Sequence, residues 1–348
     1  MKGLVGLDIG SSAVKAVELK ASGKSGEHQL VNIGLELLSP EAIVDGAIMD
    51  AGSVIDAIQR VFTGQKIKTA DVATSVSGNA VIVKKISLPQ MSSEELAESI
   101  HWEAEQYIPF DIQDVAIDYE VVEGSESGGN MDVLLVAVKK DKISDYTSVI
   151  SQAAKTPQVV DVDVFALQNC YEVNYGVDPG RVTALLNIGA SIMNINIIRG
   201  NNSIFNRDIA VGGNQYTDAI QKDLNLSFDQ AEALKRGGHV EGASTESVHP
   251  IVQAVSDNIV MEVQKTFDFF RATSSEDRID SIFLSGGTSK IQGLRELLAS
   301  RFEAGVEIMN PFNAITYNPR DFDPDFIAEV GPQAAIAVGL AVRKVGDR

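Results

Sequence analysis

Short runs of alternating apolar and polar residues open the chain and predict a three-stranded meander. The runs are "GLVGLDIG", "SAVKAVELK" and "HQLVNIGLELL", joined by turns rich in Gly and Ser. The same order returns in the second half as "RVTALLNIGA", "SIMNINIIRG" and "NSIFNRDIAVG". Aligning the two halves pairs Asp8 with Asn187, and pairs the glycines and serines of the two turns that follow. The repeated pattern therefore predicts a duplicated domain.

Between the two meanders the pattern predicts an α/β module inserted in the first half. A helix over 50–64 and strands over 70–78 and 80–89 come first. Ser92 and Glu95 then match a capping box, which starts a helix over 94–110. Strands over 114–122 and 131–139 flank a flexible tip at 123–130, and a helix over 141–155 leads into a strand over 158–165.

Helices dominate after the second meander. They are predicted over 214–224, 229–237 and 249–273, and the longest carries an apolar stripe of the kind that faces a core. A strand over 280–287, a helix over 291–302 and a closing helix of small residues over 330–343 follow. The predicted division is a first lobe at 1–88, to which a C-terminal helix at 331–346 returns, an inserted subdomain at 89–161 and a second lobe at 162–330.

Composition narrows the classes of partner. The 348 residues carry 48 acids against 29 bases, a formal net charge of -19 that repels nucleic acid and anionic lipid headgroups. The single cysteine, Cys170, fits a reducing compartment. The first ten residues have no secretory signal pattern, and the longest apolar run, Ala334 to Val342, is far shorter than the roughly 20 residues of a membrane span. We expect a cytoplasmic protein that reaches a membrane only through a partner.

The first glycine turn has the residues of a phosphate site. An acid at a strand end, followed by a tight turn, offers backbone N–H groups to phosphate oxygens and a carboxylate to a metal's water shell. Asp8, Gly10, Ser11 and Ser12 have that form, and strand alternation lets Lys15 reach the same phosphates. Two such turns facing each other would hold a phosphate chain from both sides. Since Gly and Ser are common in ordinary turns, a purely structural role is the alternative.

These motifs, in order, resemble the actin-like ATPases: "DIGSS", "NIGAS", "AVGGNQYTDAI", "AEALK" and "LSGGTSKIQGL". The inserted segment that begins "SSEELAESIHWEAEQYIPF" is more closely similar to the PilM family of cytoplasmic actin-like proteins, which act in type IV pilus assembly and have kin in type II secretion. The resemblance spans nearly the whole chain. It implies an α/β, actin-like (ribonuclease H-like), duplicated two-lobe fold with an α/β subdomain inserted in the first lobe.

The resemblance also implies ATP and Mg2+ as ligands and assigns residues to them. Asp8 would hold hydrated magnesium, and the rest of the first turn would contact phosphates. The remaining nucleotide-binding positions would be Asn187, Gly189, Ala190 and Ser191 of the second turn, Gly212, Gly213 and Asn214 lining the cleft, Glu232 and Lys235 near the ribose, and Gly286, Gly287 and Thr288 near the adenosine. For Glu232 and Lys235, a solvated ion pair on a helix is the alternative.

The amide at Asn187 departs from the many actin-like proteins that have an acid there. An amide can hydrogen-bond water or phosphate, but it adds no negative charge near the metal and cannot accept a proton. We therefore expect weak or no ATPase activity. Asp161 or Asp163 could orient the attacking water instead, and alternation puts both on one face of the predicted strand. A polar strand face at the surface explains them equally well.

The resemblance implies a partner, the cytoplasmic N-terminal tail of PilN, held in a groove between the first lobe and the inserted module. Two other functions stay open. An FtsA-like division filament would carry an amphipathic membrane helix beyond the last packed helix, where this chain ends in "AVRKVGDR". A small-molecule kinase of the same superfamily would need a carboxylate base beside an acceptor hydroxyl. The four histidines are scattered, so a paired-histidine metal site is not expected.

Overall fold

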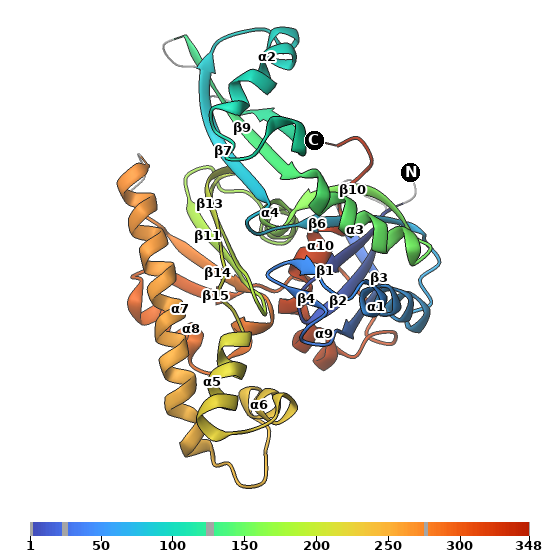
Figure 1. The fold of residues 1–348 in the computed structure, drawn as a ribbon, viewed down its shortest axis with the longest axis vertical. Coiled ribbons are helices and arrows are strands. Elements are labelled where there is room, and N and C mark those ends of the chain that lie inside the picture. Colours follow the sequence, from blue (N-terminus) through green and yellow to red (C-terminus); the bar gives the residue numbers. More distant parts are fainter. Residues whose placement is uncertain (1–2, 23–26, 123–128, 275–277, 348) are drawn as a thin grey trace.

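Each half of the chain folds as a five-stranded sheet with the same strand order. The computed structural model describes residues 3–22, 27–122, 129–274 and 278–347. The two sheets form two lobes that lie side by side, and a smaller module projects from the first lobe (Figure 1). The first sheet has the order β10-β6-β1-β2-β3 and the second the order β13-β12-β11-β14-β15.

The strands of the first sheet are β1 (Val5–Ile9), β2 (Ala13–Ala21), β3 (His28–Leu37), β6 (Asp71–Val76) and β10 (Thr156–Val162). Those of the second are β11 (Val182–Ile188), β12 (Met193–Arg199), β13 (Asn202–Ile209), β14 (Ser281–Ser285) and β15 (Gly305–Ile308). Strand β1 pairs antiparallel with β2 and parallel with β6. In the same way, β11 pairs antiparallel with β12 and parallel with β14. The register places Asp8 opposite Lys15 and Asn187 opposite Asn194. The predicted duplication is therefore present strand for strand.

Helices α1 (Ala51–Gly64) and α3 (Lys140–Gln152) cover one face of the first sheet. The Asp50 side chain caps α1 by accepting a hydrogen bond from the Ser53 N–H at 3.0 Å. The apolar face of α1, including Val54, Ile58 and Phe62, is buried against the sheet. A small hairpin, β4 (Ile43–Val44) and β5 (Ala47–Ile48), lies beside α3, since the Tyr146 hydroxyl donates to the Gly46 carbonyl at 3.1 Å.

The inserted module is a three-stranded sheet of order β7-β9-β8, with β7 (Val81–Pro89), β8 (Val115–Val121) and β9 (Asn130–Lys139). Helix α2 (Ser93–Glu105) packs on it, and a short 3-10 helix (Ile112–Asp114) precedes β8. The predicted capping box is confirmed: the Ser92 hydroxyl accepts from the Glu95 N–H, and the Glu95 carboxylate accepts from the Ser92 N–H. Most of the tip expected at 123–130 lies outside the described residues.

Sheet membership differs from the expected division in two places. Strand β7, expected in the first lobe, pairs with β9 of the inserted sheet, and β10, expected in the insertion, pairs with β6 of the first lobe. Helix α3 likewise packs in the core of the first lobe. The physical reason is long-range pairing, which local patterns do not encode. We propose boundaries for the inserted module at 81 and 139.

The second lobe carries α5 (Asn214–Leu224), α6 (Phe228–Lys235), α7 (Thr245–Thr273) and α8 (Leu294–Arg301), together with a 3-10 helix (Gly287–Lys290). Helix α7 begins four residues before its predicted start. Of its predicted core stripe, Ile259, Val263 and Phe267 are fully buried against the second sheet, whereas Ile251 and Val255 are only partly buried. The stripe therefore fixes the orientation of the long helix visible in Figure 1.

The end of the chain returns to the first sheet and closes the contact between the lobes. Helix α9 (Pro324–Val330), a 3-10 turn (Gly331–Ala334) and α10 (Ala335–Ala341) follow β15. Helix α10 lies between β1 and α4 (Asp163–Tyr175), the helix that crosses to the second lobe. A Cβ on Gly6 would overlap the Ala337 carbonyl, and one on Gly339 would overlap the Ala166 carbonyl. Only glycine allows this approach.

The core around α10 includes side chains of both sheets, among them Val17 and Ile33 of the first lobe and Leu185 and Phe283 of the second. The lobes thus share one apolar core on the side of α10. Within the described ranges, no helix has the length and apolar character needed to cross a bilayer.

Candidate functional site between the two glycine turns

The first turn follows β1 and is held by an ion pair. The Lys15 ammonium lies 3.0 Å from the Asp8 carboxylate, and both side chains are largely buried. The Gly10 N–H donates to the Ala13 carbonyl at 3.1 Å and closes the turn. A Cβ on Gly10 would lie 2.8 Å from the Lys15 ammonium. Glycine at this position therefore lets the lysine reach the acid, a contact that the sequence did not predict.

The second turn has the same backbone and a neutral pair of side chains. The Gly189 N–H donates to the Ile192 carbonyl at 2.9 Å, which matches the bond that closes the first turn. The Asn187 amide donates to the Asn194 side-chain oxygen at 2.9 Å, and Asn194 donates in turn to Asp208 at 2.8 Å. The ion pair of the first lobe is thus replaced by an amide pair that ends on an acid of β13.

Two other loops of the second lobe converge on this turn. The Gly213 N–H donates to the Gly189 carbonyl at 2.9 Å, and the Asn214 N–H donates to the Ala190 carbonyl at 2.8 Å. The Thr288 hydroxyl also donates to the Gly189 carbonyl, at 2.8 Å. The structure therefore brings together the predicted residues of three separate motifs.

Close backbone packing accounts for the glycines of these loops. A Cβ on Gly212 would lie 2.6 Å from the carbonyl oxygens of Gly189 and Ala190. Gly286 has a φ of 82°, and a Cβ there would lie 2.9 Å from the side-chain oxygen of Asn187. Side chains at either position would push the loops away from the turn.

Glu232 and Lys235 form an ion pair, but it is not a solvated one. Their side chains are only 16% and 12% exposed. The Lys235 ammonium also donates to the Thr217 hydroxyl at 2.9 Å and to the Gly213 carbonyl at 3.3 Å. Burial raises the pKa of Glu232, but hydrogen bonds from Lys235 and Thr217 outweigh it, so that the pKa lies below its ordinary value. The pair anchors α6 to the glycine loop at the edge of the site.

Asp161 and Asp163 do not share a strand face, which corrects the expectation from alternation. Strand β10 ends at Val162, where its parallel partner β6 also ends, and Asp163 is the first residue of α4. The Asp161 carboxylate lies 3.4 Å from the Arg343 guanidinium, beyond α10. Asp163 instead accepts a hydrogen bond from the Ser75 hydroxyl at 2.6 Å. The end of the strand turns the two acids toward different surroundings.

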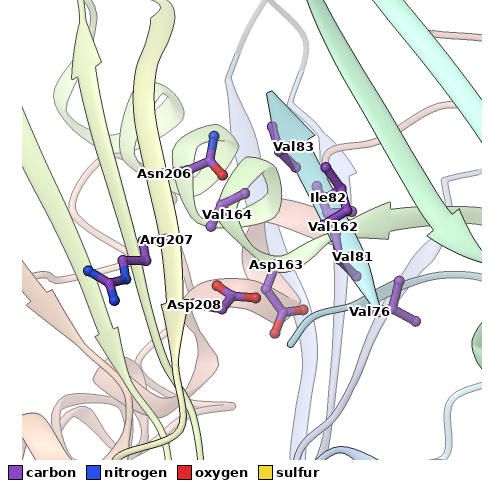
Figure 2. Close-up of a pocket in the computed structure, with 10 residues that line it drawn as sticks. All are labelled: Val76, Val81, Ile82, Val83, Val162, Asp163, Val164, Asn206, Arg207 and Asp208. Atoms are coloured by element: carbon purple, nitrogen blue, oxygen red, sulfur yellow. The ribbon is translucent and has the colours of Figure 1, made fainter. Parts of the chain in front are cut away.

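Asp163 and Asp208 point into one cavity of about 170 Å³ at the junction of the lobes and the inserted sheet. Figure 2 shows the two carboxyl groups side by side beneath apolar side chains, including Val81 and Ile82 of β7, with the guanidinium of Arg207 directed away. Burial, followed by the charge of Asp8, raises the pKa of Asp163 to about 6. Burial also raises the pKa of Asp208. The cavity is acidic, and its walls are otherwise mostly apolar.

Several residues of the site were not predicted. Gly78, between β6 and β7, donates its N–H to the second carboxylate oxygen of Asp208 at 2.7 Å. A Cβ on Gly78 would lie 3.2 Å from Ile192, which ends the second turn, so this turn faces the first lobe.

Lys142 of α3 donates to the Gly46 carbonyl, and burial lowers the pKa of this lysine. Asp208 lies four residues before Gly212, and this nearness to a site motif was the available signal. Lys142 carried none.

The two turns have the donors that a phosphate chain requires. Among the described residues, the N–H groups of Ser11, Ser12, Ala190 and Ser191 donate to no other group. Free N–H groups in tight turns are the usual ligands of phosphate oxygens. Within the same residues, no three His, Cys, Asp or Glu side chains lie close enough to hold a metal directly.

Comparisons with known proteins agree with this geometry. The protein-family model described as type IV pilus assembly protein PilM matches residues 6–345. A solved PilM-PilN type IV pilus biogenesis complex is similar to the chain with 28% identity, 99% of each chain covered and a TM-score of 0.88. The cell division protein FtsA of Staphylococcus epidermidis is 25% identical over 88% of this chain and 74% of its own length.

The ADP-bound MreB5 of Spiroplasma citri shares only 12% identity, with 97% and 95% of the two chains covered and a TM-score of 0.55. At this identity the similarity shows the fold alone. Together with the two matching sheets, these relatives confirm the predicted actin-like, two-lobe fold.

Proposed function

Because the chain belongs to the PilM family of type IV pilus assembly proteins, we propose that it is an actin-like scaffold of a pilus assembly complex. It works at the cytoplasmic face of the inner membrane, to which a PilN-type partner tethers it. ATP with Mg2+ binds between the two glycine turns, and its presence sets the geometry of the lobes. The observation that carries this proposal is the pair of turns closed by the same hydrogen bond, each with free N–H groups.

Each turn has its own part in binding. Ser11 and Ser12 offer N–H groups to the phosphates, and Lys15 offers its ammonium group. Asp8 holds that ammonium in place and faces the metal's water shell. Ala190 and Ser191 approach the phosphates from the second lobe, while the backbone of Gly212, Gly213, Gly286, Gly287 and Thr288 borders the nucleoside. Magnesium, when bound, supplies positive charge that offsets the charge of the phosphates.

Hydrolysis is slow or absent in this proposal. Asn187 cannot act as a base, and its amide is already engaged by Asn194. Of the two candidate acids, we assign the orientation of water to Asp163, because it faces the cavity near Asp8 and is held by Ser75. Its raised pKa leaves it ionised in most molecules at neutral pH, so that it can accept a hydrogen bond from water.

The effect of nucleotide binding is transmitted to the inserted module through Asp208. This acid is linked to the second turn by Asn194 and to the root of β7 by the Gly78 N–H. Closing the lobes on a nucleotide keeps the Gly78 bond, whereas opening them breaks it. The position of β7 therefore follows the state of the cleft.

Isothermal titration with ATP and Mg2+, with and without a PilN tail peptide, tests this coupling. We expect each ligand to tighten the other by the same factor, because linkage acts equally in both directions. A steady-state turnover comparable to that of a metabolic kinase would contradict the scaffold assignment, and so would the absence of any nucleotide binding.

The open edge of β7 is the seat that we propose for the tail. Strand β7 pairs with β9 on one side only, and its residues Val81, Ile82 and Val83 line the cavity of Figure 2. An extended peptide can pair with such an edge through its backbone and place apolar side chains against Val81, Ile82 and Val83.

Ile82→Glu tests this seat, with Val121→Glu as the control. Val121 is exposed on β8, the opposite edge of the same sheet. We expect the first variant to lose at least about tenfold in affinity for the tail, since it buries a charge in an apolar contact. The control should bind normally, and equal losses in both variants would exclude the β7 edge.

A further inference from the structure

The inserted module is the most acidic part of the chain. Residues 86–138 hold twelve of the 48 acids and none of the 29 lysines and arginines. This module projects away from the two lobes (Figure 1). Its outer helix α2 therefore presents negative charge away from the nucleotide site and from Val81–Val83, the proposed tail seat.

The lysines that flank this segment leave the acids of α2 unpaired. Lys84 lies over the ring of Tyr107 and Lys139 over the ring of Phe110, with 4.9 and 4.3 Å from ammonium to ring centre. Lys85 pairs with Asp132 at 3.1 Å. Within the described part of the module, the acids of α2 take part in no ion pair. The positive charge stays at the root of the module, and the outer helix remains unpaired.

Helix α2 arranges its acids around one large exposed ring. Glu94, Glu98, Trp102 and Glu105 are spaced by four, four and three residues, so that they lie on one face. All four are exposed, and Trp102, the only tryptophan of the chain, is 75% exposed. The opposite face, with Leu96, Ile100 and Ala104, is buried in the module. The structure thus shows no packing role for the exposed face of α2.

The chemistry of this face selects its partner. Because this face is negatively charged, it should not bind nucleic acid, an anionic lipid surface, or the same face of a second copy of this chain. A cationic protein segment has the matching charge, and an arginine can stack on the indole ring of Trp102. Tryptophan is also the residue that most often anchors a protein interface. Cytoplasmic segments next to membrane spans carry an excess of lysine and arginine.

We propose that the outer face of α2 binds a Lys/Arg-rich cytoplasmic segment that adjoins the membrane span of a partner, with Trp102 as the anchor. The identification of the partner as a membrane protein rests on the proposed function, whereas the cationic chemistry rests on α2 itself. This contact is separate from the β7 edge, which recognises backbone and apolar side chains. It holds the acidic module toward the membrane-side basic segments and away from the lipid.

Fluorescence of the single tryptophan tests the proposal directly. The full-length protein is titrated with an eight-residue peptide of alternating arginine and serine, and the emission of Trp102 is recorded at low and high salt. We expect a saturable change in emission, with a dissociation constant at least about tenfold weaker at high salt, because exposed charges are screened. Binding without any change at Trp102 would overturn the proposal.

Charge reversal separates this face from the general acidity of the protein. The test variant is Glu94→Lys/Glu98→Lys, and its control is Asp325→Lys/Glu329→Lys, which reverses two exposed acids at the same spacing on α9. We expect at least about a tenfold loss of affinity in the first variant and less than about a threefold change in the control. Equal losses in both would show only nonspecific attraction and overturn the proposal.

Further experiments test the role of Trp102 and the two alternative partners, lipid and a second copy of the chain. Trp102→Ala should weaken binding of the arginine-serine peptide at least about tenfold, as measured by calorimetry, whereas the matched variant Phe326→Ala should not. Co-sedimentation with phosphatidylglycerol vesicles, or a change in Trp102 emission on self-association, would overturn the proposal in favour of lipid or of a second copy. The tail-binding result for Ile82→Glu is independent, because the arginine-serine peptide has no apolar side chains.

Discussion

The two glycine turns have the same backbone, but the first carries a charged pair of side chains and the second a neutral pair. In the first lobe an acid at the end of the first strand faces a lysine across the register, at 3.0 Å. At the equivalent places of the second lobe stand Asn187 and Asn194, joined at 2.9 Å. The cross-strand contact is present in both copies, but an ion pair makes it in the first and two neutral amides make it in the second.

The acid of the second lobe is not lost but lies one strand further along. Asn194 faces Asp208 on β13, whereas Lys15 of the first lobe faces Leu35 on β3. Asp208 gives its second oxygen to the N–H of Gly78 in the other lobe. The acid of the first turn is paired within its own lobe, whereas the acid of the second lobe accepts a hydrogen bond from the other lobe. We propose that this difference favours binding and closure over rapid hydrolysis.

The largest effect is expected from Asp8→Asn, which gives the first turn the chemistry of the second. It leaves the buried ammonium of Lys15 without its countercharge and should lower the free energy of unfolding by about 3 kcal/mol. Nucleotide affinity should fall about a hundredfold, measured by calorimetry. The double variant Asp8→Asn/Lys15→Asn recreates the amide pair, so it should recover stability but not nucleotide binding. Recovery of both would show that the ion pair has no part in binding.

Asp163, which lies near both turns, should produce a pH-dependent effect. Its pKa is about 6 in the folded protein against 3.8 as the ordinary value, so the folded state holds the proton more tightly. The stability that this group contributes is present below about pH 3.8 and is lost as the pH rises through about 6, by up to about 3 kcal/mol. Urea unfolding of the wild type and Asp163→Asn at pH 4 and pH 7 measures this. Relative to the wild type, the variant should be more stable at pH 7 than at pH 4, and a constant difference would contradict the shift.

Asn187→Asp restores the acid to the second turn. The new carboxylate would meet the side-chain oxygen of Asn194, and turning Asn194 to donate to it would direct an oxygen toward Asp208. The free energy of unfolding should fall by about 2 kcal/mol. Phosphate release from ATP should rise about tenfold, since a carboxylate can orient and deprotonate water. If release stays unchanged, the amide at this position is not what limits hydrolysis.

Asp208→Asn should have the smallest effect. The amide oxygen can still accept from Gly78, but the amide nitrogen would then meet the donor group of Asn194, which should lower the free energy of unfolding by about 1 kcal/mol. The sharper readout is the coupling between ATP and the tail peptide in paired titrations, which should decrease while each ligand still binds alone. Coupling of full strength in this variant would exclude the route through Gly78.

The sequence revealed whatever depends on local pattern. The meanders, the capping box at Ser92, and the placement of Lys15 on the strand face beside the first turn follow from alternation and short-range hydrogen bonding. Asp208 required knowledge of which residue on β13 faces Asn194, and that is a property of strand register.

The two errors have a similar cause. Alternation placed Asp163 on a strand because it could not show that β6, the partner of β10, ends at Val76. The location of β7 was missed because its partner strand begins some forty residues later in the sequence. In both cases distant pairing decided what local propensity left open.

The apolar core around α10 determines how the molecule comes apart. Since side chains from both sheets are packed into it, neither lobe can unfold without exposing surface that belongs to the other. Calorimetric melting should therefore give one transition, with the calorimetric and van't Hoff enthalpies equal, and either half produced alone should fail to fold. We therefore expect the two duplicated sheets to behave as a single thermodynamic unit.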